Sequence, residues 1–451
     1  MRRAGTRGFG RLAIFLAGAA LTMPVSAAEA VEDVTFIHAG HLLDRPGQAP
    51  RGPSTIVIRG GRIAEVRDGI VPASQGEKVV DLRDAFVLPG LIDMHVHLNG
   101  RGNPLQARMD GATRDAEDVL VTMAVSARDT VEAGFTTVRD LGAPPRGIRA
   151  LRDAIERGDL PGPSIVNAGQ MISSTAGHGD ASNGLREEFA DAVHAHQVNI
   201  CNGPDDCRRA TREQMRLGAL VIKFSATGGA TSNIAGGLGQ QLTDEEMNAI
   251  VDAAHAWGRK AAAHAHGVDG IKAALRAGAD SIEHGTFIDD EAIALFKKTG
   301  AYLVPTMLAP VTTAQQAKAG MLSTAAAEKV GEGKSAIPHH RAAIKAGVRI
   351  AFGTDSGISR NGQNALEFAL LVDRGMTPAA AIEAATVNAA TLLGRESRIG
   401  TIEAGKDADI VAVRGDPLSD VRALEQMWFV MKRGTVIKSG GERASFPPEK
   451  R

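Results

Sequence analysis

The stretch Phe86–Leu98, FVLPGLIDMHVHL, decides the fold. Its apolar residues predict a buried strand that leads into two histidines, His95 and His97. Because side chains alternate along a strand, both imidazoles point to one side and Val96 points to the other. Two neighbouring imidazoles at a strand end can provide half of a metal site, although two hydrogen-bonded surface histidines would give the same pattern. The rest of the chain has to decide between these alternatives.

The segments that follow alternate between apolar strands and helical stretches. The strand-like segments are TTVRDLG, SIVNAG, VIKFSA, KAAAHAHG, SIEHG, YLVPTM and RIAFGTDSG. Together with the first stretch they make eight strands separated by helices, a pattern typical of an α/β fold of the (β/α)8 TIM-barrel type. An open doubly wound sheet fits less well, because no GxGxxG motif opens a helix after a first strand. We assign the barrel to residues 86–399.

Short strand-like segments also occur at both ends of the chain. Residues 34–81 contain a Gly60-Gly61 hairpin signal, and a turn at Arg433-Gly434 separates two similar segments near the C-terminus. The sequence therefore predicts one small composite β-sandwich domain formed from residues 29–85 and 400–445. Two unrelated β appendages are the alternative.

The N-terminal 28 residues have the features of a signal peptide. Four arginines within residues 2–11 precede an apolar run at residues 12–21, which is shorter than a membrane span, and small residues follow up to Ala27 and Ala28. We expect cleavage there and a periplasmic or secreted protein without membrane contact afterwards. An uncleaved membrane anchor is the alternative.

The two cysteines, Cys201 and Cys207, enclose the turn-forming sequence NGPDD. In an oxidising compartment they could form a disulfide, whereas two free thiols are the alternative that spacing does not exclude. The charge is balanced, with 51 Lys and Arg against 52 Asp and Glu. Such a balance gives no indication of a nucleic-acid partner or of an electrostatic membrane patch.

Functional residues of a (β/α)8 barrel lie at the C-terminal ends of its strands. Polar residues recur at these positions of the expected strands, at His95, His97, Lys223, His264, His266, His284 and Asp355. Residues from five strand ends would converge in space, so the sequence predicts one shared site.

The segments VLPGLIDMHVHL, VIKFSATGG, AAHAHG, SIEHG and FGTDSG resemble those of the metal-dependent amidohydrolase superfamily, and the likeness extends over about residues 34–440. Within the superfamily the chain is most similar to the imidazolonepropionase-like branch, which includes Xaa-Pro and Xaa-Arg dipeptidases and ochratoxinase. These motifs together are specific for the superfamily and less specific for the branch.

The resemblance implies a site for two divalent metal ions, usually Zn²⁺. His95, His97 and Asp355 would bind one ion, His264 and His284 the other, and Lys223 would bridge both as a carbamate formed with CO₂. The carbamate has a physical reason, since an ammonium cannot coordinate a cation whereas an anion with two oxygens can.

The resemblance also implies catalytic roles. A metal-bridging hydroxide would attack the amide carbonyl, and Asp355 would act as general base and then as general acid. His266 would donate a hydrogen bond to the substrate. His178 in STAGHGD would be a second substrate-binding residue, with a structural turn histidine as the open alternative. In this loop Ala176 stands where many relatives have glycine.

The substrate implied by the branch is a small molecule with an amide bond to a C-terminal amino acid: a dipeptide, an N-acyl amino acid or an ochratoxin A-type compound. Its carboxylate needs a cation, and Arg139 and Arg360 are candidates. A structural pairing with Asp140 fits Arg139 better, and a solvated loop position fits Arg360 better. The Gly-rich loop Thr227–Gln241 would act as a lid, with a plain flexible turn as the alternative. Self-association into a homo-oligomer is expected by analogy with relatives.

Other functions remain open on the sequence alone. The same scaffold could hydrolyse a cyclic amide of the imidazolone type or act as a deaminase, and a non-catalytic binding protein is an alternative of another class. Five further histidines are interpreted as ordinary surface or helix residues: His194, His196, His255, His339 and His340.

Overall fold

The computed structural model describes residues 34–232, 237–330 and 336–446, which belong to one compact unit. The expected signal peptide, residues 1–28, lies outside the described residues. None of the helices in the described ranges combines the length and the apolar character that crossing a membrane requires.

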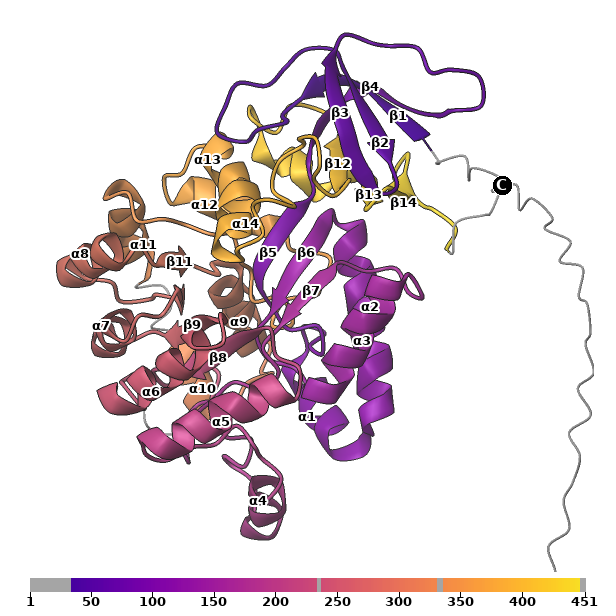
Figure 1. Cartoon of the computed structure of the whole chain (residues 1–451). Helices are drawn as coiled ribbons and strands as arrows, with labels where there is room; N and C mark the ends of the chain where they lie inside the picture. The colour runs from indigo at the N-terminus through magenta and orange to yellow at the C-terminus, as the bar shows by residue number, and fades with distance from the viewer. Residues whose placement is uncertain (1–33, 233–236, 331–335, 447–451) are drawn as a thin grey trace, which may run out of the picture. The chain divides into compact units, whose positions relative to one another are not determined.

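The strands of both chain ends form one mixed sheet, in the order β15-β14-β13-β12-β4-β1-β2-β3. Figure 1 shows the N-terminal strands in indigo beside the C-terminal strands in yellow. Only β1 and β4 pair in parallel; the other neighbours are antiparallel. The strands are β1 (Val34–Leu42), β2 (Ser54–Arg59), β3 (Arg62–Asp68), β4 (Lys78–Pro89), β12 (Ile410–Val413), β13 (Met427–Lys432), β14 (Thr435–Ser439) and β15 (Glu442–Arg443).

This sheet curls until β3 meets the segment that leads into β12. The amide of Ile63 donates to the carbonyl of Lys406, and the amide of Gly405 donates back to the carbonyl of Ile63. The curled sheet encloses an apolar core that includes Ile37, Val87 and Phe429. The small composite domain predicted from both ends of the chain is therefore a single curved sheet.

Seven parallel strands and one extended segment form the barrel. The strands are β5 (Leu91–Val96), β6 (Phe135–Asp140), β7 (Ser164–Asn167), β8 (Val221–Ser225), β9 (Lys260–Ala265), β10 (Ser281–His284) and β11 (Tyr302–Val304). Backbone hydrogen bonds close the ring: Leu220 donates to Asn167 between β7 and β8, Ala351 donates to Leu303, and Met94 donates to Phe352. The segment around residues 350–354 thus takes the place of the eighth strand, in agreement with the (β/α)8 prediction.

Helices surround the barrel (Figure 1). Those between β5 and β11 are α1 (Pro104–Thr113), α2 (Ala116–Glu132), α3 (Pro145–Arg157), α4 (Glu187–His194), α5 (Pro204–Arg216), α6 (Asp244–His255), α7 (Val268–Arg276) and α8 (Asp290–Thr299). After β11 come α9 (Leu308–Lys318), α10 (Thr324–Val330), α11 (Ala336–Lys345), α12 (Leu366–Asp373), α13 (Pro378–Glu383) and α14 (Ala389–Leu392).

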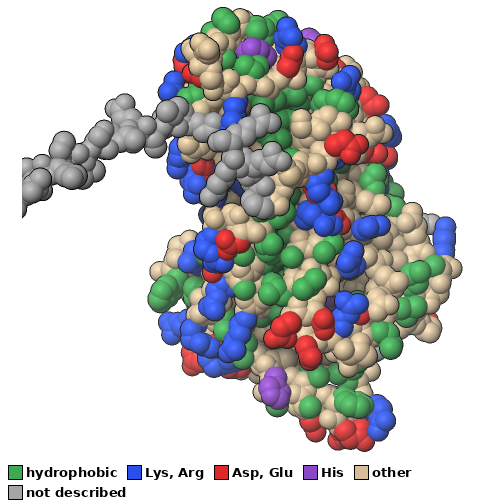
Figure 2. All heavy atoms as spheres, turned by 90° about the vertical axis from the view of Figure 1, so that its right-hand side faces the viewer, with side chains coloured by type: hydrophobic (Ala, Val, Ile, Leu, Met, Phe, Trp, Pro, Cys, Tyr) green, Lys and Arg blue, Asp and Glu red, His purple; other side chains and the backbone are tan. Residues whose placement is uncertain are grey.

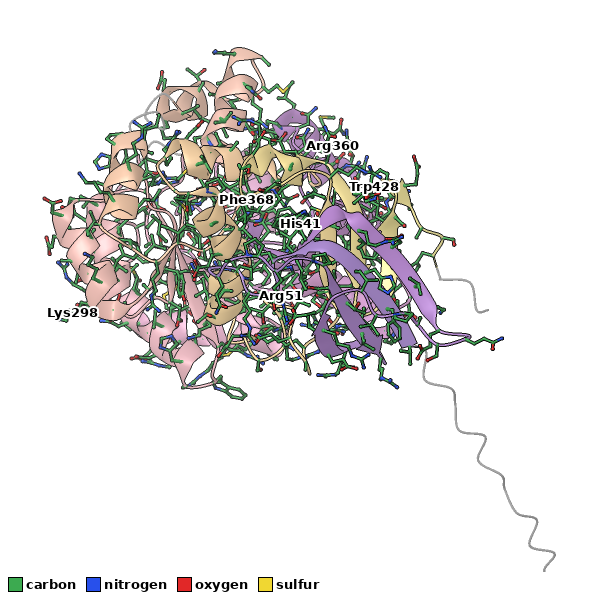
Figure 3. The ribbon with its side chains drawn as sticks, turned by 90° about the horizontal axis from the view of Figure 1, so that it is seen from above. His41, Arg51, Lys298, Arg360, Phe368 and Trp428 are labelled. Atoms are coloured by element: carbon green, nitrogen blue, oxygen red, sulfur yellow. A yellow bond between two sulfur atoms is a disulfide. The ribbon has the colours of Figure 1, made fainter. Side chains whose placement is uncertain are left out.

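An aromatic stack fastens α12 to the barrel. Phe368 of α12, which Figure 3 labels, lies with its ring 4.4 Å from that of Phe352, and Phe352 lies 5.4 Å from Phe135 of β6. All three rings are fully buried. On the face of the molecule in Figure 2, basic and acidic side chains are interspersed, as the balanced composition leads one to expect.

The stretch Phe86–Leu98 is divided between the mixed sheet and the barrel, which corrects the prediction that the barrel begins at Phe86. Phe86 and Val87 pair with β1, and Pro89 pairs with Ile410 of β12, so this part belongs to the mixed sheet. Gly90 then separates β4 from β5. A side chain at Gly90 would lie 2.2 Å from the hydroxyl of Thr136, so only glycine lets the chain pass so close to β6.

Candidate metal centre and active site

A cavity of about 780 Å3 opens at the C-terminal ends of the barrel strands. All eight residues predicted to take part in metal or substrate binding line it: His95, His97, His178, Lys223, His264, His266, His284 and Asp355. The ends of parallel strands meet at one edge, which explains how residues so distant in sequence come together.

Asp355 meets the two histidines of the first barrel strand. Its Oδ1 lies 3.2 Å from Nε2 of His97 and 3.5 Å from Nε2 of His95. The two imidazole rings are 5.4 Å apart. One carboxylate oxygen facing two imidazole nitrogens is a donor set suited to a divalent transition metal.

The second group of histidines lies beside the first. His264, His266 and His284 have one ring nitrogen each within 4.8 Å of the others, and His95, His284 and Asp355 form an overlapping set. His284 therefore connects the two groups. Since both His264 and His266 approach His284, the assignment of His264 as the ligand remains a prediction.

Most of these rings are fixed from behind by an oxygen atom. Nδ1 of His97 donates to the carbonyl of Gly142 at 2.9 Å, and Nδ1 of His284 lies 2.7 Å from the hydroxyl of Thr306. These contacts leave Nε2 for the cavity side. His264 is held at its other nitrogen, with Nε2 3.4 Å from the carbonyl of Gly228, so Nδ1 is its metal-binding candidate.

Burial keeps most of the imidazoles neutral, the form that binds metals. It lowers the pKa of His95 to about 4 and that of His266 to about 3, and it lowers the pKa values of His264 and His284 well below the ordinary value. His97 differs: burial lowers its pKa, but the hydrogen bond with Asp355 and the charge of that carboxylate outweigh burial and raise it.

The surroundings of Lys223 are suited to a carbamylated lysine. It lies on β8, is 2% exposed, and its Nζ has no hydrogen-bond partner within the described residues. Burial lowers the pKa of this amine to about 8, which favours the neutral form that reacts with CO₂. An orphaned amine among imidazoles is costly, whereas a bridging anion with two cations would satisfy both charge and coordination.

Three residues of the site have strained backbones. His284, Asp355 and Thr306 have φ values of 70°, 59° and 46°, in the left-handed region that residues with a Cβ rarely occupy. Strain of this kind is concentrated at functional sites, where surrounding contacts enforce it. Here the strained backbone directs the side chains of His284 and Asp355 into the cavity. It also directs the hydroxyl of Thr306 toward His284.

His178 lines the cavity beside His264. Its ring is 4.3 Å from that of His264, and its Nδ1 contacts the hydroxyl of Ser232 in the Gly-rich loop. Ala176, two residues before it, has a φ of 58°, so the departure from glycine is accommodated with a strained backbone. A Cβ on Gly229 would lie 2.2 Å from the His178 ring, so this glycine is needed for the close approach.

The sequence interpretation missed a buried carboxylate behind the site. Glu283 is fully buried, and it accepts hydrogen bonds from Nδ1 of His95 at 2.9 Å and from Arg139 at 2.7 Å. Arg139 therefore neither binds substrate nor pairs with Asp140. Adjacent strand residues point to opposite sides, which separates these two side chains. The acidic residue directly before the histidine in SIEH was the available signal.

His340 was also misinterpreted as an ordinary histidine. It is 4% exposed, lines the cavity, and its Nε2 donates to the carbonyl of His284 at 2.8 Å. Burial lowers its pKa to about 4. Helix α11 brings it to the site from a position that no strand pattern could indicate. By contrast, His255 is an exposed partner of Asp280, as expected.

Arg360 is exposed and is not part of the cavity wall, which agrees with its interpretation as a solvated loop residue and not as the carboxylate clamp. Figure 3 marks its position. The cations that line the cavity besides Lys223 are Arg101, Arg108 and Lys329, none of which the sequence pattern had distinguished.

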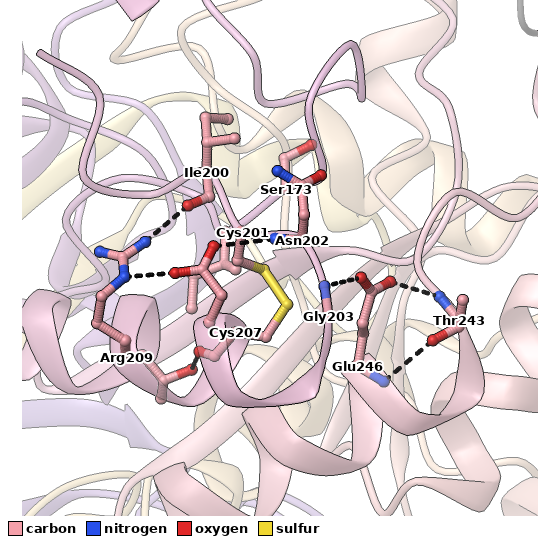
Figure 4. Close-up of a disulfide and its surroundings, with 12 residues drawn as sticks. Ser173, Ile200, Cys201, Asn202, Gly203, Cys207, Arg209, Thr243 and Glu246 are labelled. Atoms are coloured by element: carbon pink, nitrogen blue, oxygen red, sulfur yellow. Dashed lines mark hydrogen bonds and ion pairs between the residues drawn. A yellow bond between two sulfur atoms is a disulfide. The ribbon is translucent and has the colours of Figure 1, made fainter. Parts of the chain in front are cut away.

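Cys201 and Cys207 form a disulfide, the first of the two alternatives. Figure 4 shows it at the start of α5, where the amide of Cys201 donates to the carbonyl of Ser173 at 2.9 Å. Glu246 accepts from the amide of Gly203 at 2.6 Å. The disulfide thus fixes the loop that carries His178 from behind.

Known proteins share this architecture. The model of the amidohydrolase family matches residues 86–440. Ochratoxinase from Aspergillus niger is 31% identical over 428 residues, which cover 90% of this chain and 87% of that protein. A crystal structure of a Xaa-Pro dipeptidase with methionine bound in its active site is similar with a TM-score of 0.84 and 38% identity, covering 90% of this chain and all of that one (100%). A crystal structure of a prolidase complexed with N-methylphosphonate-L-proline is similar with a TM-score of 0.80 and 29% identity. The match covers 90% of this chain and 100% of that one.

Proposed function

Because this chain belongs to the amidohydrolase family and is a hydrolytic enzyme, we propose that it cleaves the amide bond to a C-terminal amino acid with two bound metal ions. The observation that carries this proposal is the convergence of four imidazoles, Asp355 and the orphaned amine of Lys223 in one cavity. The similarity to ochratoxinase and to a Xaa-Pro dipeptidase supports the substrate class, namely dipeptides, N-acyl amino acids or ochratoxin A-type compounds.

In this proposal His95, His97 and Asp355 hold one ion, His264 and His284 hold the other, and carbamylated Lys223 bridges them. Zinc suits this set of nitrogen and oxygen donors. The metals would supply a hydroxide nucleophile at neutral pH and polarise the scissile carbonyl.

The residues of the chain itself handle the proton and the developing charge. Burial raises the pKa of Asp355, but the neighbouring His95 and His97 outweigh burial and lower it, so this group is a carboxylate at neutral pH. It accepts the proton of the attacking water and then gives it to the leaving nitrogen. His266 lies with Nδ1 2.6 Å from the hydroxyl of Thr286. When that hydroxyl donates, Nε2 carries the proton and can stabilise the oxyanion.

The rival functions are less well supported. A non-catalytic binding protein would be expected to lack metal ligands, whereas every expected ligand lines the cavity. A mononuclear deaminase would not need a carbamylated lysine, so the buried amine of Lys223 argues against it. A cyclic amide hydrolase uses the same scaffold and stays the second candidate.

The deciding experiment is a screen of dipeptides, N-acyl amino acids and cyclic amides with the zinc-loaded protein, together with metal analysis. We expect about two metal ions per chain and turnover of substrates with a free C-terminal carboxylate. Preferential turnover of cyclic amides would favour the second candidate. Retention of no metal would refute the binuclear proposal. The disulfide agrees with export to an oxidising compartment, and we propose a periplasmic or secreted homo-oligomer.

A further inference from the structure

Lys329 lies in the cavity wall on α10 and is 8% exposed. Its Nζ donates to the carbonyl of Ser232 at 2.6 Å and to that of Gly229 at 3.2 Å. Two carbonyls of the Gly-rich loop therefore hold this ammonium at a fixed place. A preorganised cation binds an anion without the entropic cost of ordering a long side chain.

A short chain of contacts leads from this ammonium to the metal site. Ser232 contacts His178 through its hydroxyl, and the ring of His178 lies 4.3 Å from that of His264. In an amide to a C-terminal amino acid, three bonds of about 1.3–1.5 Å separate the scissile carbonyl carbon from the carboxylate carbon. A carboxylate near His178 and Lys329 would thus leave the amide carbonyl near the metals.

The charges around the cavity also favour an anion. Among the described residues that line it, the only carboxylate is Asp355, against the cations Arg101, Arg108 and Lys329. A basic side chain on the leaving amino acid would be repelled by these cations, whereas the apolar residues of the cavity wall, Leu322 among them, suit an apolar side chain.

From these observations we propose that Lys329 binds the carboxylate of the substrate's C-terminal amino acid and selects apolar leaving residues over basic ones. This inference rests on the proposed function for the identity of the substrate. Lys329 is then a specificity-determining residue, and Arg101 and Arg108 add attraction at the entrance.

The test compares calorimetric binding of L-leucine and L-leucinamide to the zinc-loaded protein. A charge-assisted hydrogen bond predicts that the carboxylate form binds at least about tenfold more tightly. Lys329→Met should remove this difference, and Lys329→Arg should keep part of it. Lys318→Met on α9 is the matched control, because Lys318 is exposed and outside the cavity. L-Lysine should bind at least about tenfold more weakly than L-leucine.

Equal affinity for L-leucine and L-leucinamide in the wild-type protein would overturn the inference, as would no binding of L-leucine. So would equal loss of both ligands in Lys329→Met, because a residue that only fixes the loop would have that effect. The two proposals fail separately. Discrimination between the ligands without hydrolysis of any amide would refute the proposed function alone, and equal turnover of free and amidated dipeptides would refute this inference alone.

Discussion

Nδ1 of His95 donates directly to Oε2 of Glu283 at 2.9 Å. The other carboxylate oxygen accepts from Arg139, so the imidazole is fixed through a buried ion pair. Such outer partners orient a ligand and raise its basicity. The contact joins the first strand of the barrel to the sixth.

Glu283→Gln should therefore weaken metal binding by about 10- to 100-fold. The amide keeps the shape of the side chain but removes the charge that balances Arg139 and orients His95. Competition with a chelator of known zinc affinity measures the loss. Glu245→Gln, an exposed change on α6, is the control. Unchanged zinc affinity in Glu283→Gln would show that His95 does not depend on this contact.

Lys223→Ala should hold fewer than two metal ions per chain and lose activity. The variant lacks the group that would become the bridging anion. Metal analysis after dialysis and turnover of the best dipeptide are the measurements. Adding bicarbonate during reconstitution should raise the activity of wild-type protein and leave the variant unchanged. A variant with full metal content and full activity would end the carbamate interpretation.

Asp355→Asn should keep much of the metal and lose about 10²- to 10⁴-fold in kcat. The amide can still approach His95 and His97, but it cannot accept the proton from water. Steady-state kinetics together with metal analysis separate the two effects. If kcat fell only in proportion to metal content, Asp355 would be a ligand without a role in proton transfer.

Replacing both cysteines, Cys201→Ala with Cys207→Ala, should lower the free energy of unfolding by about 2 kcal/mol, because the reduced unfolded chain has more conformational freedom. Urea unfolding of the oxidised wild type and the variant gives this difference. Reducing the wild type should reproduce it. KM should also rise, since the disulfide supports the loop of His178. An unaltered midpoint would contradict a stabilising role.

Asp280 provides a test of pH dependence away from the metal site. It accepts from Lys260, His255 and the amide of Ala261, each at 2.8 Å. Burial raises its pKa, but the bonds from Lys260 and Ala261 outweigh burial and lower it. A carboxylate with a lowered pKa stabilises the folded protein at pH values above 3.8, which is its pKa in the unfolded chain. This stabilisation is lost as the pH falls through the pKa of the folded state.

Asp280→Asn should therefore destabilise the protein by about 2 kcal/mol at pH 7, with a difference that shrinks below pH 3.8. Urea unfolding at several pH values measures it. Asp252→Asn, exposed on α6, should have little effect at any pH. A pH-independent difference would mean that packing, not ionisation, accounts for the loss.

The barrel and its polar strand ends could be predicted because they are periodic in the sequence. Apolar runs that end in His95, Lys223 or His284 are local patterns, and the geometry of parallel strands brings them together. The division at Gly90 escaped prediction, since only the close approach of Thr136 reveals it. An uninterrupted apolar run does not indicate which of two sheets each half joins.

The missed residues that lie on helices have no local signature. His340 and Lys329 come from helices after β11, whose placement depends on tertiary packing. Arg139 was misinterpreted because its nearest acidic neighbour in sequence, Asp140, points to the opposite side of the strand. Its true partner, Glu283, lies on another strand, and only the closed barrel places them 2.7 Å apart.

The union of β4 with β12 has a consequence during synthesis. Pro89 and Leu88 pair with Ile410 and Val411, so β4, which pairs with β1 on its other edge, gains this second partner only after β12 has been synthesised. Until then one edge of β4 stays unpaired. The nascent polypeptide consequently cannot complete the sheet that supports the strand of His95 until then, and metal loading should follow synthesis of β12.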